Sequence, residues 1–258
     1  MTRKVSHIYV VRKDYLWPAI IDLDGKAGTT ATTHAKNSDD YLRTQRQLSA
    51  EDAKVNEILT KLRLWKEGSI RVPISAFYYI YANQVILVSM SEDPLHCENR
   101  LYHLEEEEIT RLNQFLKRAQ TPKQPYLQLA LETFEQTFRV VQNELEFLSL
   151  MICLEALLND GASELRYKLA RSTAVLLGES RTDAETIFKN VKQLYDKRSM
   201  LVHSGSKKTL TVSDTLLLRT YVRGILRKLV PLDRKKEDIA AGLTCLGFGE
   251  SKRFLFNV

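Results

Sequence analysis

The spacing of apolar and polar residues changes near residue 122. Downstream, apolar side chains recur every three or four positions, which is the spacing of one face of an α-helix. Successive helices of this kind with short connections form an up-and-down bundle. The pattern predicts five such helices, at 125–139, 143–161, 163–180, 182–203 and 211–230. A short helix and a tail follow from residue 235.

Upstream of that point the pattern is mixed. Short runs of β-branched and aromatic residues alternate with helical spacing and with a stretch rich in Gly, Thr, Ser, Asn and Asp that is typical of a long loop. Strands are predicted at 7–11 and 19–23, the loop at 25–40, helices at 48–68 and 104–120, and a hairpin within 74–90 that turns at 82–84.

Pro122 and Pro125 mark the change, because two prolines so close together disfavour a continuous helix. We therefore predict an α+β N-terminal region over residues 1–122, of unknown role. An all-α up-and-down helical bundle with a C-terminal tail follows over residues 123–258. The fold class expected from the sequence is thus mixed.

Composition adds limits on the class of protein. With 44% hydrophobic and 27% charged residues, the chain is typical of a globular protein. Its beginning has no secretory signal, and the most apolar stretch, 147–158, contains Glu155 and is too short to cross a bilayer. The isolated cysteines Cys97, Cys153 and Cys245 fit neither a disulfide framework nor a zinc site. We expect a cytoplasmic protein with no membrane association, and Cys153 in its core.

Positive charge is concentrated in one segment. The net charge is +6, and the segment 189–208 carries six basic residues against a single acid, Asp196. Such a cluster indicates an anionic partner, of which nucleic acid is the commonest. The alternative is a solvated basic face of a helix.

The same segment contains candidate chemistry in Arg198, Ser199 and His203. An imidazole can transfer protons near neutral pH, and a guanidinium can bind a phosphate through its fork of donors. With a serine hydroxyl these groups suffice for RNA transesterification without a metal. Arg198 and His203 are five residues apart, about 140° round a regular helix, so they could border one groove only if two such helices packed together.

Two stretches of the sequence are similar to the HEPN superfamily, specifically to its Apea-like branch. They are "FLSLMICLEALL" (147–158) and "IFKNVKQLYDKRSMLVHSG" (187–205), and the resemblance covers about 145–230. Arg198 and His203 match the family's Arg-x4–6-His motif, and Ser199 matches the polar residue that usually follows the arginine. The resemblance does not extend to the first 120 residues, which resemble no known family.

This resemblance implies a function. HEPN proteins are all-helical, and many dimerise so that both motifs face a shared cleft. Many are metal-independent endoribonucleases of toxin–antitoxin, abortive-infection or other anti-phage systems, while others only bind RNA, nucleotides or partners. The expected roles are therefore proton transfer by His203, phosphate stabilisation by Arg198 and assistance by Ser199. No metal and no cofactor are expected, and the expected partners are RNA, a second copy of the chain and a separately encoded regulatory protein.

Support for the motif is expected from Glu155 and Tyr195. In this family an acid on the earlier helix can brace the motif arginine, so the resemblance implies a Glu155–Arg198 or Glu155–lysine pair. The alternative is that Glu155 faces solvent.

Contacts to RNA are expected from basic residues near the motif. Arginines at every fourth position from 219 to 227 form one stripe on a helix, which favours a row of phosphate contacts or, alternatively, a solvated face. The candidate RNA-binding residues are Lys197, Lys207, Lys208, Arg219, Arg223 and Arg227.

Overall fold

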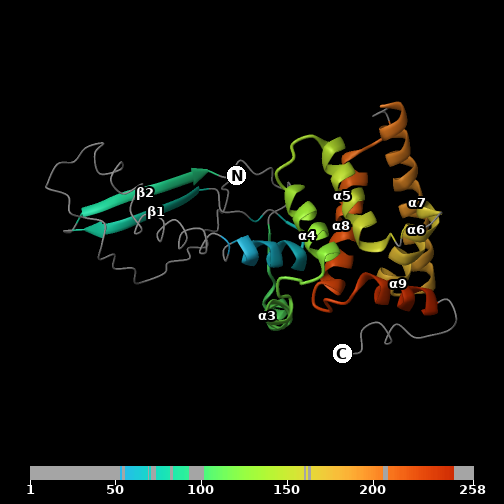
Figure 1. Cartoon of the computed structure of the whole chain (residues 1–258), viewed down its shortest axis with the longest axis horizontal. Coiled ribbons are helices and arrows are strands. Elements are labelled where there is room, and N and C mark those ends of the chain that lie inside the picture. Colours follow the sequence, from blue (N-terminus) through green and yellow to red (C-terminus); the bar gives the residue numbers. More distant parts are fainter. Residues whose placement is uncertain are drawn as a thin grey trace. The chain divides into compact units, whose positions relative to one another are not determined.

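The computed structural model describes residues 53, 56–68, 70, 74–81, 84–92, 102–159, 161, 164–205 and 209–246. The chain divides into two compact units (Figure 1). One unit comprises Met1–Lys54 and Val72–Asp93, and the other comprises Val55–Arg71 and Pro94–Val258. The strands predicted at 7–11 and 19–23, the loop at 25–40 and the tail after residue 246 lie outside the described residues.

In the first unit, the described residues form an antiparallel hairpin. Strand β1 covers Ile74–Tyr81 and strand β2 covers Gln84–Glu92. Tyr81 pairs with Gln84, so β1 ends and β2 begins at the break that the sequence predicts. The α+β class of the whole region 1–122 stays a prediction.

The second unit is a bundle of helices, as the sequence predicts. Residues 56–65 form its first described helix, and a 3-10 turn, Glu106–Glu108, precedes α3. The helices that follow are α3 (Ile109–Arg118), α4 (Pro125–Gln136), α5 (Asn143–Leu158), α6 (Leu165–Leu177), α7 (Arg181–Ser204), α8 (Val212–Leu229) and α9 (Lys236–Cys245).

Helix α5 is at the centre of this bundle. It contacts α4, α6, α7, α8 and α9, and Figure 1 shows it between α4 and the pair α6–α7. Because its apolar residues surround the helix axis, α5 has no broad polar face, which is typical of a buried helix. Cys153 is fully buried there, as expected; its thiol donates to the Ala130 carbonyl, and burial raises its pKa.

Helices α6 and α8 both contact α7 and run antiparallel to it. Asp196 of α7 pairs with Arg166 at the start of α6, and the Phe188 ring contacts the Tyr167 ring. On another side of α7, Asn190 donates to the Tyr221 hydroxyl of α8. These contacts fix the middle of α7 against α6 and α8, upstream of the motif.

The start of α7 corrects one sequence expectation. Glu185 follows Thr182 at capping-box spacing, which predicts that the helix begins at Thr182. In the structure Ser180 is the N-cap, and its side chain accepts a hydrogen bond from the backbone amide of Asp183. The prediction was wrong because Ser180 and Asp183 offer the same spacing two residues earlier, where the side chain can satisfy an amide at the helix end.

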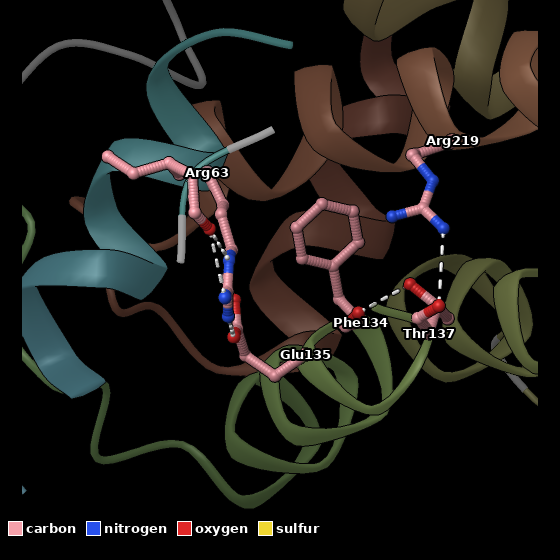
Figure 2. Close-up of polar contacts among 6 residues, drawn as sticks. Arg63, Phe134, Glu135, Thr137 and Arg219 are labelled. Carbon is pink, nitrogen blue, oxygen red and sulfur yellow. Dashed lines mark hydrogen bonds and ion pairs between the residues drawn. The ribbon is translucent and has the colours of Figure 1, made fainter. Parts of the chain in front are cut away.

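A cluster of arginines and phenylalanines joins helix 56–65 to α4 and α8. Arg63 pairs with Glu135 (Figure 2). The Arg63 guanidinium lies 4.7 Å from the Phe138 ring centroid, and the Arg219 guanidinium lies 4.3 Å from the same centroid. Arg223 donates to the Arg63 carbonyl over 2.8 Å. Residues 55–71 and 94–122 therefore belong with the helical unit, although the sequence boundary at 122 assigns them to the N-terminal region.

Among the described residues, none of the helices is long and apolar enough to cross a membrane.

Candidate active site at the end of helix α7

The motif lies on the last two turns of α7. The helix is continuous through Ser204 and ends at Gly205, whose φ of +64° is in the left-handed region that glycine adopts without strain. Arg198, Ser199 and His203 are therefore held on a regular helix rather than on a loop, so their relative directions follow from helix geometry.

Arg198 is held by two side chains. Its Nη2 atom lies 3.5 Å from Oε1 of Glu155 on α5, and its guanidinium carbon lies 5.8 Å from the Tyr195 ring centroid. The arginine side chain keeps 27% of its surface exposed, so it can still meet a ligand. The pair between Glu155 and Arg198 that the family resemblance implies is present, and Tyr195 contacts the same guanidinium.

The Glu155 carboxylate depends on this arginine. Its Oε1 atom is buried and accepts no hydrogen bond from the described residues. A carboxylate withdrawn from water needs charge compensation, and Arg198 is the cation recorded beside it. The interaction therefore fixes the position of the guanidinium and also neutralises Glu155.

His203 faces away from this pair. The His203 side chain is exposed in the final turn, and Ser199 is half-buried one turn before it. From Arg198 to His203 the helix turns by about 140° and rises about 7.5 Å. Within one chain, the structure therefore does not bring Arg198 and His203 together.

Three consecutive residues of α7 pair with three different helices. Asp196 pairs with Arg166 of α6 over 2.5 Å, Lys197 with Asp214 of α8 over 2.6 Å, and Arg198 with Glu155 of α5. Because neighbouring side chains are about 100° apart, one short segment can reach three sides. Sequence reasoning missed the pairs of Asp196 and Lys197, since their partners are set by the packing of the bundle.

Lys197, a predicted RNA contact, therefore already has a partner. Asp214 also caps α8: it accepts from the Thr211 amide, while the Thr211 hydroxyl accepts from the Asp214 amide. Burial opposes ionisation of Asp214, but hydrogen bonds from Lys197 and Thr211 favour the carboxylate more strongly, and its pKa lies below the usual value.

Replacing Asp214 tests this cap. Since its pKa is lowered in the folded state, the carboxylate stabilises the fold above the unfolded pKa of about 3.9, and the benefit is lost as pH falls through the folded value. Asp214→Ala should lower the free energy of unfolding by about 1–2 kcal/mol at pH 7. Urea unfolding at pH 7 and pH 3, with Ser213→Ala as the neighbouring control, measures this. An Asp214→Ala deficit that is as large at pH 3 as at pH 7 contradicts the assignment.

The predicted arginine stripe on α8 is not an exposed row. Arg219 and Arg223 are buried, with 3% and 6% of their surfaces exposed. Arg219 donates to the Thr137 carbonyl over 3.3 Å (Figure 2). It also donates to Glu146 over 2.6 Å. The prediction that these two arginines contact RNA phosphates is therefore wrong, and so is the alternative that they form a solvated face. The aromatic rings beside α8 cover both side chains. Arg227 is exposed and donates to the Trp65 carbonyl, and Lys207 and Lys208 lie outside the described residues.

Comparisons of the chain with protein-family models, with curated protein sequences and with solved structures find no match. Any function must therefore be inferred from the residues and the geometry of this chain. In the part of the chain that the structure describes, no group of three or more His, Cys, Asp or Glu side chains could hold a metal ion.

Glu155 should act as a positioning residue. Glu155→Gln removes the charge that holds Arg198 but keeps the side-chain shape. For the ribonuclease that the family resemblance implies, we expect RNA cleavage to fall about tenfold, which is about 1.4 kcal/mol of transition-state stabilisation. The free energy of unfolding should change by less than about 1 kcal/mol, because both partners are partly exposed. The exposed Glu132→Gln on α4 is the control, and cleavage rates together with urea unfolding measure both effects. Equal cleavage rates for the two variants would show that Glu155 does not position Arg198 for the reaction.

Proposed function

We propose that this protein is a metal-independent endoribonuclease of the HEPN type, working in a toxin or anti-phage defence system. One observation carries the proposal: Arg198 is held by Glu155 and Tyr195, yet stays partly exposed, at the end of the helix that presents His203. A prepositioned guanidinium and an accessible imidazole are the groups that phosphodiester transesterification needs.

The reaction would use these groups as follows. The 2′-hydroxyl of the RNA loses its proton to one imidazole, and its oxygen attacks the adjacent phosphorus. The bond from phosphorus to the 5′ oxygen breaks, and that oxygen takes a proton from an acid. The products are a 2′,3′-cyclic phosphate and a 5′-hydroxyl. Arg198 stabilises the charge on the phosphorane, and the Ser199 hydroxyl donates to a phosphate oxygen.

A second copy of the chain completes the site. Base and acid must begin in opposite protonation states, so a single imidazole cannot serve as both in one step. Since Arg198 and His203 of one chain diverge by about 140°, a twofold arrangement would let the arginine and histidine of two chains border one cleft.

The products of the reaction test the proposal. The purified full chain is incubated with unstructured RNA in the presence of EDTA, and the ends of the fragments are analysed. The proposal predicts 2′,3′-cyclic phosphate and 5′-hydroxyl ends, formed equally with and without the chelator. Fragments with 5′-phosphate ends, or cleavage that EDTA abolishes, would contradict it.

A second function is a non-catalytic module that binds RNA or a protein partner. It is favoured by the divergence of Arg198 and His203, which are about 140° apart on α7 within one chain. This alternative predicts binding without turnover and a His203→Ala variant that behaves like the parent in cells.

A further inference from the structure

The outer face of α7 connects His203 with the opposite end of the helix. Residues on it are three or four positions apart, so they form one stripe, and each is half-buried or exposed. From Phe188 to His203 the stripe rises about 22 Å. Its members are Arg181, Glu185, Phe188, Lys192, Asp196, Ser199 and His203.

Two aromatic rings lie at the far end of this stripe. The Tyr167 ring of α6 and the Phe188 ring of α7 are 5.7 Å apart and nearly perpendicular. The Tyr167 side chain is 50% exposed, so one part of its ring is open to a ligand. A shallow depression next to it is lined by Arg181, Ala184, Glu185, Phe188 and Lys189.

The charges around the rings are unbalanced. Glu185 pairs with Arg181 over 2.9 Å and Asp196 pairs with Arg166 over 2.5 Å, so both acids of the stripe are neutralised. Lys189 and Lys192 form no ion pair with any described residue. The Lys192 ammonium lies 5.2 Å from the Phe188 ring centroid, so it adds a cation beside the aromatic pair.

We propose that Tyr167, Phe188, Lys189 and Lys192 form a platform that binds single-stranded RNA. A base stacks on the exposed Tyr167 ring, the two lysines contact phosphates, and the strand follows the outer face of α7 to His203. Exposed rings with adjacent cations bind single strands because unpaired bases offer free faces, whereas bases inside a duplex are already stacked. At about 3.4 Å per stacked nucleotide, the stripe spans about six nucleotides.

This platform deepens the proposed function and rests on it for the direction of the strand. It also explains the acids of the stripe: each is paired with an arginine, so neither repels a phosphate chain. A protein ligand with acidic side chains would meet the same two lysines, so the test includes an acidic polypeptide beside RNA.

RNA binding by the full chain tests the platform. All variants also carry His203→Ala, so that the RNA stays intact during the measurement. Binding of a labelled 12-nucleotide single strand is measured by fluorescence anisotropy. Tyr167→Ala should weaken binding about tenfold, since stacking contributes about 1–3 kcal/mol per base, while Tyr167→Phe should bind like the parent. Lys192→Gln should lower the slope of log affinity against log salt by about 0.7.

Matched controls lie on other helices. Leu129→Ala on α4 removes an equally exposed apolar side chain, and Lys117→Gln on α3 removes an exposed lysine. Both should bind RNA like the parent. Crosslinking of RNA that contains 4-thiouridine to the parent background should label the peptides of Tyr167 or Phe188, which gives a readout that needs no substitution at these positions.

Several results would overturn the platform. They are absent RNA binding at low salt, unchanged affinity in Tyr167→Ala, equal affinity for a matched duplex, crosslinks confined to other helices, or equal Tyr167-dependent binding of polyglutamate, which would indicate a protein partner. The nuclease fails separately: RNA that binds through Tyr167 but is never cut by the unmodified chain leaves the platform standing and removes the catalytic proposal.

Discussion

Replacing His203 with alanine is expected to reduce RNA cleavage by about 10²–10⁴-fold, the usual contribution of a positioned acid or base. The reason is that His203 is the exposed imidazole on the helix that presents Arg198. Folding should be unaffected, because the side chain is exposed in the last turn of α7. Initial cleavage rates at equal protein concentration measure the effect, and circular dichroism checks the helical content.

The matched control for this variant is His103→Ala. His103 is also exposed and lies beside Glu105, far along the chain from the motif. It should cleave RNA at the rate of the unmodified chain. If His103→Ala and His203→Ala lost activity equally, or if neither did, the catalytic role of His203 would be wrong.

Replacing Arg219 with alanine is expected to give the largest loss of stability, about 3–5 kcal/mol. Only 3% of the Arg219 surface is exposed. Its removal leaves the Glu146 carboxylate without the cation that lies 2.6 Å away. It also removes the guanidinium beside the Phe138 ring. Urea unfolding followed by circular dichroism measures the change in free energy.

Two further variants separate charge from packing. Arg227→Ala removes the exposed arginine two turns later on α8 and should cost less than about 1 kcal/mol. Arg219→Met with Glu146→Leu replaces the pair by apolar side chains, and it should recover much of the loss because no charge stays buried alone. A mild Arg219→Ala variant that instead weakens RNA binding would contradict the burial of this residue.

The helices were predictable because their signals are local. Apolar spacing places α7 at 182–203, and the structure has it at Arg181–Ser204. Gly205 ends the helix, as a glycine just after the last apolar residues indicates. The backbone at this position is left-handed, and glycine adopts that conformation without strain. The end of β1 at Tyr81 and the start of β2 at Gln84 also follow from local pattern.

Features set by distant residues were not predictable. The four-residue spacing correctly places Arg219 and Arg223 on one face of α8, but it cannot say whether that face is covered. The covering rings, Phe134 and Phe138, come from α4 and the turn after it, about 80 residues earlier. The interpretation of these arginines as RNA contacts therefore failed on tertiary packing.

The candidate site shows the same division. The Glu155–Arg198 pair was expected from the family resemblance, and the structure contains it. The Lys197–Asp214 pair was missed, although the spacing of Thr211 and Asp214 is that of a capping box and placed an acid at the start of α8. Tyr167 and Phe188 gave no signal in the sequence, because their proximity depends on how α6 packs against α7.

The most direct test of a HEPN ribonuclease is paired expression in bacteria of the unmodified chain and of His203→Ala, followed by separation of total RNA on a gel. A HEPN ribonuclease predicts growth arrest and fragmented RNA for the unmodified chain alone, with equal amounts of both proteins. Equal toxicity of the two forms would contradict it, because the motif at the end of α7 would then not be the active site.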